Sequence, residues 1–184
     1  MLALPKHKMN VDEYLGWAED QPGRFELYAG IVYAMSPERA GHAEVKFAIQ
    51  AVLLAGIRRA ALPCHMLPDG MTIRVDSHTA FEPDALVYCG AKVSNSAVEV
   101  QEPMILVEVL SPSTRHIDAS AKLAGYFRLP SVQHYLIIDP GARLIIHHAR
   151  NGEAIATRIL RDGSLRLDPP GIEFGFGEVF PTNA

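Results

Sequence analysis

An apolar run from Met104 to Leu110, interrupted only by Glu108, constrains the fold of this chain more than any other stretch. Branched apolar side chains ended by Ser111-Pro112 are typical of a strand that is buried on both faces of a sheet. A carboxylate in such a strand is costly unless a cation or strong hydrogen bonds compensate its charge. The sequence therefore predicts that Glu108 has a specific partner.

A second carboxylate, Asp84, directly precedes another apolar run, Ala85 to Tyr88. Two acids on neighbouring strands can converge on one point, and binding of a divalent metal is a common reason for that arrangement. In the alternative interpretation, Glu108 pairs with an arginine and Asp84 only caps the start of its strand. The residues alone leave both interpretations open.

Length and composition favour one globular domain, residues 1–184, with a substantial core. The chain has 184 residues, of which 48% are hydrophobic and 21% charged, which is typical of a folded protein. The formal net charge of −4 argues against a protein that coats nucleic acid. A local basic patch would still allow an enzyme to contact DNA or RNA briefly.

The two cysteines, Cys64 and Cys89, have no spacing typical of a zinc site or of a disulfide framework. We therefore expect both to be reduced core thiols in a cytoplasmic protein. The first ten residues lack the apolar region of a signal peptide. The apolar runs are too short to cross a bilayer, so no membrane association is expected.

The first forty residues predict a helix and then a hairpin. Asn10 can cap a helix in which Glu13 occupies the capping-box position. The segment 25–34 follows, with Ala29-Gly30 as its turn. Phe25 and Leu27 face one side of the hairpin, and Glu26 and Tyr28 face the other. From this segment alone, Glu26 is best interpreted as a solvent-facing residue on an edge strand.

Ser36-Pro37-Glu38 predicts the start of a helix that continues to about residue 61, with a core stripe of apolar residues at helical spacing. His42 lies in its first turns. A lone histidine there is more often a surface or cap residue than a functional one, so its assignment is an accessory one.

A further helix is expected from Ser113 or Thr114 through Leu129. Asp118 and Lys122 are spaced to share one of its faces, which allows a surface ion pair. Alternatively, Lys122 projects back over the end of the Glu108 strand, where it would orient a water or stabilise developing negative charge.

The rest of the chain is predicted to be mainly extended. Residues 62–75 are interrupted by a turn at 68–70, and strands are expected at 132–138, 143–149 and 154–160. His147 and His148 would face opposite sides of their strand, which is poor spacing for one metal. The Gly- and Pro-rich tail keeps apolar residues and is expected to pack over the body.

The sequence resembles the PD-(D/E)XK nuclease superfamily, and more closely the Uma-two family of bacterial endonucleases. The matching segments are RFELYAGIVYAMSP, Gly41-His42, EPDALVY, ILVEVLSPST and AKLAGYF followed by VQHYLIIDP. The resemblance implies a restriction-endonuclease-like α/β (α+β) fold, a mixed β-sheet flanked by helices. It also implies a nuclease that acts on DNA, and a homodimer, the form in which nucleases of this type often cut both strands.

The resemblance also assigns roles to individual residues. Asp84 and Glu108 match the two motif acids and would be metal ligands, with the Val109 carbonyl as a third ligand. Glu26 matches the acid of the early hairpin. The superfamily's motif lysine normally lies two residues after the second acid, where this chain has Leu110. Lys122, from the following helix, is the matching candidate.

A phosphodiester is anionic and resists attack by water, and a divalent ion can offset that charge. Carboxylate ligands suit Mg²⁺ or Mn²⁺, whereas zinc sites usually contain Cys and His clusters. We therefore expect a metal-dependent endonuclease with Glu26, Asp84, Glu108 and Lys122 as catalytic residues.

Two alternatives remain open from the sequence. One is an inactive interaction or oligomerisation module on the nuclease fold. The other is a metal hydrolase acting on a small phosphoester, which a missing basic strip beside the site would favour. The candidates for that strip are Arg115, His116, Lys122 and Arg128. A serine nucleophile is disfavoured because Gly-x-Ser-x-Gly is absent from the sequence.

Overall fold

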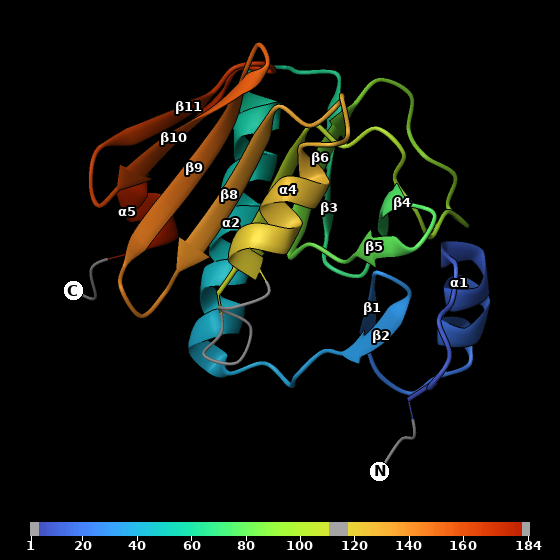
Figure 1. The fold of residues 1–184 in the computed structure, drawn as a ribbon. Coiled ribbons are helices and arrows are strands. Elements are labelled where there is room, and N and C mark those ends of the chain that lie inside the picture. Colours follow the sequence, from blue (N-terminus) through green and yellow to red (C-terminus); the bar gives the residue numbers. More distant parts are fainter. Residues whose placement is uncertain (1–3, 111–117, 182–184) are drawn as a thin grey trace.

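A computed structural model describes residues 4–110 and 118–181 (Figure 1). Its largest unit is a six-stranded sheet that is mixed, because β7 and β8 are parallel and the other neighbours are antiparallel. In spatial order the strands are β10 (Ala154–Leu160), β9 (Leu144–Asn151), β8 (His134–Asp139), β7 (Ile105–Val109), β6 (Ala85–Cys89) and β3 (Cys64–Pro68).

The strand β7 lies inside this sheet, and all five of its residues are buried. Its position follows from its sequence, because an apolar run on both faces is stable only where both faces are covered. Asp84 comes immediately before β6, and its backbone N–H donates to the Val107 carbonyl at 2.9 Å. The two acids therefore lie on neighbouring strands, as the sequence predicts.

A smaller four-stranded sheet has the order β2 (Ile31–Ala34), β1 (Phe25–Tyr28), β5 (Thr79–Phe81) and β4 (Ile73–Asp76). The predicted hairpin is confirmed as β1–β2, with positive φ angles at Ala29 (51°) and Gly30 (83°). A tight turn at 77–78 closes a second hairpin, between β4 and β5.

The helix α1 (Val11–Glu19) packs on this smaller sheet. Its N-terminus has the predicted capping box, in which Asn10 and Glu13 exchange side-chain to backbone hydrogen bonds of 2.8 and 2.9 Å. Phe25 and Leu27 are buried in the same cluster, so the other face of the hairpin points away from α1.

The helix α2 (Ala40–Arg59) begins later than predicted. Its N-cap is Arg39, which makes no side-chain capping bond, and the expected start at Ser36 is wrong. The reason is tertiary: the Glu38 carboxylate bonds to Lys46 instead of to the helix terminus. By length and composition α2 could cross a membrane, contrary to the expectation from the sequence. Four of its apolar side chains, Ile49, Val52, Leu53 and Ile57, are buried in the core.

Both faces of the central strands of the large sheet are covered, whereas the edge strand β10 is mostly exposed (Figure 1). One face packs against α2 and the tail, and the other packs against α4 (Leu123–Tyr126) and residues of β4 and β5. The strand β11 (Ser164–Leu167) precedes the tail, which forms β12 (Ile172–Gly175) and α5 (Phe176–Val179) and packs over the body, as predicted, with most of its apolar side chains buried.

The described part of the connection from β7 to β8 is helical and ends earlier than predicted. It contains a π-helix, η1 (Asp118–Lys122), and then α4, which ends at Tyr126 rather than Leu129. Arg150 donates to the carbonyls of Phe127, Leu129 and Val132 at 2.8–2.9 Å and so fixes the chain after the helix. The expected caps, Ser113 and Thr114, lie outside the described residues.

The prediction that Cys64 and Cys89 are reduced thiols is wrong in this structure, where they form a disulfide. The two residues face each other in the antiparallel register of β3 and β6, a proximity that their separation in the sequence does not indicate. Disulfides are uncommon in cytosolic proteins, so the cytoplasmic location stays a prediction.

Candidate functional site

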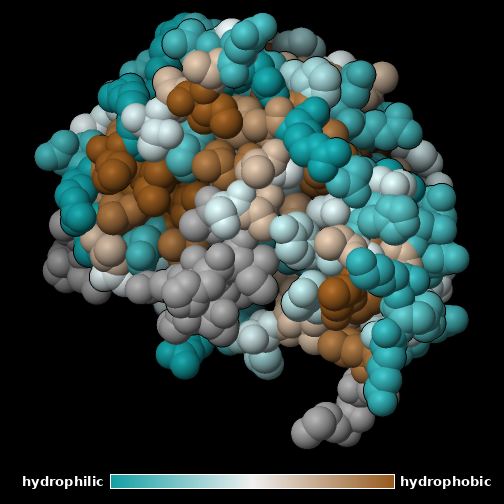
Figure 2. Space-filling model, in the orientation of Figure 1, coloured by the Kyte–Doolittle hydropathy of each residue, from teal (hydrophilic) through white to brown (hydrophobic). Residues whose placement is uncertain are grey.

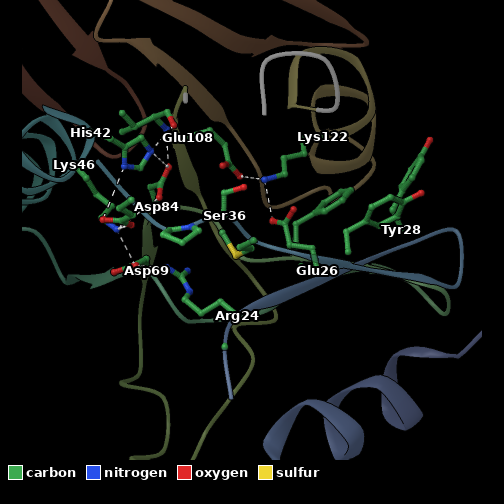
Figure 3. Close-up of a pocket in the computed structure, with 18 residues that line it drawn as sticks. Arg24, Glu26, Tyr28, Ser36, His42, Lys46, Asp69, Asp84, Glu108 and Lys122 are labelled. Atoms are coloured by element: carbon green, nitrogen blue, oxygen red, sulfur yellow. Dashed lines mark hydrogen bonds and ion pairs between the residues drawn. The ribbon is translucent and has the colours of Figure 1, made fainter. Parts of the chain in front are cut away.

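One cavity of about 600 Å³ brings together all five residues that the sequence analysis selected (Figure 3). Glu26 comes from β1, His42 from α2, Asp84 from the start of β6, Glu108 from β7 and Lys122 from η1. The segment before α2 closes another side of the cavity. Segments far apart in the sequence therefore contribute polar groups to one space.

Asp84 is almost fully buried, with 5% of its surface exposed. Its Oδ2 accepts the backbone N–H of Val109 at 2.7 Å and lies 3.8 Å from Nε2 of His42, and its Oδ1 lies 4.0 Å from Nζ of Lys46. Burial raises the pKa of the Asp84 carboxyl, and the Val109 hydrogen bond opposes that rise. Asp84 thus does more than cap a strand.

Three polar residues of α2 surround Asp84 because they recur every fourth position. His42 and Lys46 approach its carboxylate, and Gln50 donates from Nε2 to the Asp84 carbonyl at 2.8 Å. Residues four apart share one helix face. Lys46 and Gln50 were not predicted as site residues, although the His-x-x-x-Lys-x-x-x-Gln spacing places three polar side chains on one face of an otherwise apolar helix and could have indicated them.

Glu108, on the neighbouring strand, is 4% exposed and its partners include a lysine and a tyrosine. Its Oε1 accepts from Nζ of Lys122 at 2.9 Å and from the Tyr126 hydroxyl at 2.7 Å. Burial beside Glu108 raises the pKa of Tyr126 well above its usual value, so its hydroxyl stays protonated and donates. The compensating partner expected for Glu108 is thus present.

Lys122 is 2% exposed and joins two carboxylates, since its Nζ also lies 2.9 Å from Oε1 of Glu26. It lies 5.5 Å from the centroid of the Phe81 ring. The side chain therefore projects over the strand β7, as one of the two predicted arrangements required. Whether it also contacts the Asp118 side chain falls outside what the structure describes.

Glu26 does not face open solvent, so that interpretation of the hairpin is wrong. Its side chain is 13% exposed, holds Lys122 and accepts the backbone N–H of Glu82 at 3.0 Å. The sequence could not indicate this burial, because the covering residues come from η1 and from the segment after β5.

An outer group of charges supports the site from positions that the sequence analysis did not select. Arg24 pairs with Asp69 and, at 3.0 Å, with Glu82, and Lys46 pairs with Glu38 and, at 3.0 Å, with Asp69. Burial alone would raise the pKa of Asp69, but the hydrogen bond from Lys46 and the charge of Arg24 lower it by more than that, so the net pKa shift is downward. Asp69 is thus held ionised between two cations.

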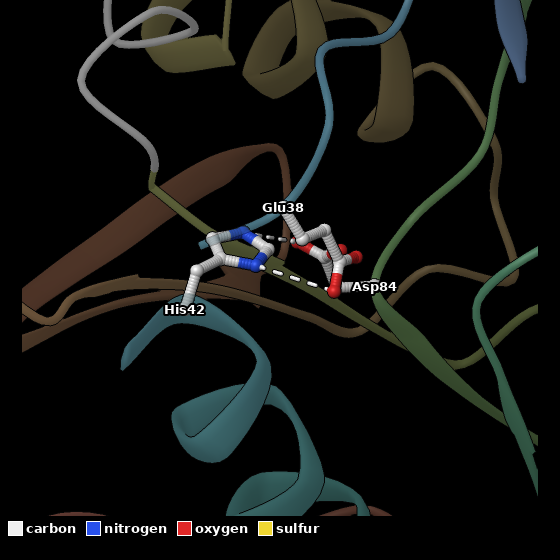
Figure 4. A group of neighbouring side chains, drawn as sticks. All are labelled: Glu38, His42 and Asp84. Atoms are coloured by element: carbon white, nitrogen blue, oxygen red, sulfur yellow. Dashed lines mark ion pairs between the residues drawn. The ribbon is translucent and has the colours of Figure 1, made fainter. Parts of the chain in front are cut away.

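His42 supplies a donor atom suited to a metal (Figure 4). Its Nε2 lies 2.7 Å from the Val109 carbonyl, which can only accept, so Nε2 carries a proton; in the neutral imidazole Nδ1 then carries a lone pair. Nδ1 is buried without a hydrogen-bond partner in the described part of the chain. It lies 4.0 Å from Oε2 of Glu38, and two facing acceptors favour a cation or a proton between them.

The donor atoms of Glu38, His42 and Asp84 lie within 4.8 Å of one another, as expected of a group that could bind a metal ion. The charge of the cavity also favours binding of a metal cation. Its described lining contains five carboxylates, including Asp84 and Glu108, against three cationic side chains. With all of these groups ionised and His42 neutral, the lining has a net charge of −2, which one divalent ion would balance.

Comparison with known proteins places this architecture in a family. A solved structure from Anabaena variabilis, described as a "putative nuclease belonging to DUF820", superposes with a TM-score of 0.70 at 14% identity. The match covers 94% of this chain and 97% of that one. The predicted fold class, a mixed sheet flanked by helices, is thereby confirmed.

Two proteins of Synechocystis sp. are similar in sequence. The uncharacterized protein slr1290 is 25% identical over 191 residues, covering 97% of this chain and 94% of that protein. The uncharacterized protein sll1609 is 26% identical over 171 residues, covering 91% and 93%. The family model Uma2, described as "Putative restriction endonuclease", matches residues 11–181 and supports a nuclease-type role. The chain belongs to the Uma2 family, as its sequence motifs predict.

Proposed function

We propose that this protein is a metal-dependent endonuclease that hydrolyses phosphodiester bonds of DNA. The observation that carries the proposal is the convergence of Asp84 and Glu108, two buried acids from neighbouring strands, on one cavity that also contains Lys122. Each acid is costly to bury, and a shared function explains why both are placed there. The family and its nuclease-like fold support the same activity.

The residues fit a divalent cation. Asp84 and Glu108 supply carboxylate oxygens, and the unpartnered Nδ1 of His42 with Glu38 offers a further pair of donors beside them. Oxygen-rich ligands favour Mg²⁺ or Mn²⁺. When bound, such an ion supplies neutralisation of phosphate charge and a lowered pKa for a water.

The chain's own groups perform the remaining tasks. Lys122 places a cation at the cavity wall, where it can stabilise the charge of a scissile phosphate. Glu26 holds that cation in position, and Tyr126 orients Glu108 through their hydrogen bond. Lys46, fixed by Glu38 and Asp69, keeps a second positive charge next to Asp84.

The direct test is incubation of purified protein with supercoiled plasmid and Mg²⁺ or Mn²⁺. We expect nicked or linear product that EDTA prevents. Asp84→Asn removes a charge while keeping the shape of the side chain, and it should abolish cleavage; Asp162→Asn, at an exposed turn, is the matched control. Equal cleavage by wild type and Asp84→Asn would indicate a contaminating nuclease and refute the proposal.

One observation favours a second candidate, a hydrolase of small phosphoesters. In the described part of the lining, the cationic side chains are Arg24, Lys46 and Lys122, and all three are paired with carboxylates, whereas duplex DNA is usually held by several phosphate contacts. Two of the candidates for a basic strip, Arg115 and His116, lie outside the described residues. Hydrolysis of bis(p-nitrophenyl) phosphate without cleavage of DNA would select this candidate.

A homodimer is also expected from the resemblance to the nuclease family, and sedimentation of the purified protein tests it.

An inactive module on the same fold predicts a different result. A metal that binds only the folded protein must raise its Tm. An unchanged Tm in millimolar Mn²⁺, together with intact plasmid, would favour the inactive module.

A further inference from the structure

The β1–β2 hairpin presents an apolar and aromatic face that the protein leaves partly uncovered. Tyr28 and Tyr33 are 39% and 38% exposed, and Ile31 is 46% exposed. Figure 2 shows hydrophobic surface in the region where Figure 1 draws this hairpin. Exposed aromatic residues that gather beside a functional site usually serve binding rather than stability.

The strand register places this face on the cavity. Glu26 is directly opposite Tyr33, and Tyr28 is directly opposite Ile31. Residues 26 and 28 are two apart on β1 and therefore point to the same side. The carboxylate that holds Lys122 thus shares its surface with two tyrosine rings, and both tyrosines line the cavity.

The rings are connected to the acidic site through direct contacts. Tyr28 stacks on Phe81 with a centroid separation of 6.1 Å and an interplanar angle of 25°. Phe81 in turn lies 5.5 Å from Nζ of Lys122 and 5.6 Å from the Tyr126 ring. Figure 3 shows Tyr28 at the opposite end of the group from His42 and Asp84, with Lys122 between them. The cavity therefore has an aromatic end and an acidic end.

A flat aromatic surface beside a site for phosphate is suited to an unpaired nucleobase. Bases stack on aromatic side chains with little dependence on their identity, because every base has a π-face. A paired base has its faces covered by its neighbours in the helix, and it must be unstacked before a protein ring can reach it. The tyrosines would therefore distinguish unpaired from paired nucleotides.

The size and charge of the cavity point the same way. A volume of about 600 Å³ lies in the range of pockets that hold one small molecule, so the cavity has room for a nucleotide or two. In the described part of the lining, Arg24, Lys46 and Lys122 are each paired with carboxylates, so stacking would add affinity that these paired cations supply only weakly through phosphate contacts.

We propose that the Tyr28–Tyr33 face binds unpaired bases, and that the substrate of this site is a single-stranded segment of DNA. This inference rests on the proposed nuclease function, but it makes a separate statement about binding. Tyr28 and Tyr33 are binding residues that select the substrate, and they are not part of the acidic group that performs hydrolysis.

The test measures binding separately from cleavage. A fluorescein-labelled single strand of twenty nucleotides and the same strand in a blunt duplex are titrated by anisotropy, with Ca²⁺ in place of Mg²⁺. Tyr28→Leu and Tyr33→Leu keep apolar bulk and remove the flat ring. Each should weaken binding of the single strand by about tenfold. Tyr28→Phe keeps the ring and should bind as wild type does.

Phe47→Leu is the matched control, because Phe47 is an exposed aromatic residue on α2 (72% exposed) that is not among the residues lining the cavity. It should leave binding unchanged. Thermal denaturation of each variant shows that the fold is intact. We expect the wild-type protein to bind the single strand at least about tenfold more tightly than the duplex, which corresponds to one stacked base.

The outcomes separate this inference from the nuclease proposal. Selective binding of single strands that depends on both tyrosines, with no cleavage in Mg²⁺ or Mn²⁺, supports the inference and contradicts the nuclease function. Cleavage of duplex plasmid that is unaffected by the leucine variants supports the nuclease function and overturns the inference. Equal or tighter binding of the duplex overturns it too. So does a change in oligomeric state in Tyr28→Leu without a change in binding, since the face would then be a contact between copies of the chain.

Discussion

Replacement of Lys122 by methionine tests the electrostatic design of the site, because methionine keeps the length of the side chain and removes its charge. Lys122 is 2% exposed, and its Nζ lies 2.9 Å from carboxylate oxygens of both Glu26 and Glu108. Without it, these two acids lose their shared cation. Breaking a buried ion pair by removing one partner costs about 3–5 kcal/mol. For a chain of this length that corresponds to a fall in Tm of about 6–20 °C.

The assay is urea and thermal denaturation without divalent ions, followed by the same measurement in Mn²⁺. A divalent ion should recover part of the loss, because it returns positive charge to the carboxylates. The double variant Glu26→Gln/Lys122→Met should lose less stability than Lys122→Met, since one of the two uncompensated carboxylates is also gone. Arg166→Met is the matched control: the Arg166–Asp168 pair is 61% exposed on each side, and its loss should stay within about 1 kcal/mol. A loss of that small size in Lys122→Met would show that the two buried acids do not depend on the charge of Lys122.

Three further predictions concern the rest of the fold. Burial lowers the pKa of His147 to about 4. On acidification the unfolded chain therefore binds a proton that the folded chain excludes, so the free energy of unfolding should fall by as much as about 3 kcal/mol from pH 6.5 toward pH 4. Urea titrations of His147→Leu should show a flatter pH profile. Gly56→Ala should destabilise the protein by about 1–3 kcal/mol, because the new Cβ would lie 2.6 Å from an isoleucine side chain of β12. Gly41→Ala on the same helix meets no atom within 4 Å and should be neutral or stabilising. Equal changes in Tm for the two variants would contradict the close packing of α2 on β12. Reduction of the Cys64–Cys89 disulfide, whose residues are 25 apart, should cost about 3 kcal/mol, and an unchanged Tm in dithiothreitol would show that the bond contributes little.

The sequence predicted correctly those segments whose residues are stable in only one structural setting. The apolar run of β7 is stable only inside a sheet, and the capping box of α1 and the Ala29-Gly30 turn are formed by neighbours in the chain. The start of α2 was misplaced because Glu38, which looks like a helix-capping acid, bonds to Lys46 instead. Tertiary contacts override local signals in this way.

In the candidate site, too, residues with an unusual local setting were predicted and residues defined by tertiary contacts were not. Asp84 and Glu108 stood out because a carboxylate beside or within a buried strand is unusual. Arg24 and Glu82 are 58 positions apart, and nothing in either segment indicates the pairing. The partner of Lys122 likewise depends on how η1 crosses the end of β7. The disulfide follows from the register of β3 and β6, which sequence spacing does not determine.

We propose that Asp84 and Glu108 together bind one divalent ion in the cavity they share. A crystal structure of the protein soaked in Mn²⁺, with the ion located by its anomalous signal, would show whether they do. We expect a peak in direct coordination with a carboxylate oxygen of each acid, and no such peak in Asp84→Asn. Binding of Mn²⁺ elsewhere, while Lys122 still occupies the space beside Glu108, would show that the two acids do not form a shared metal site.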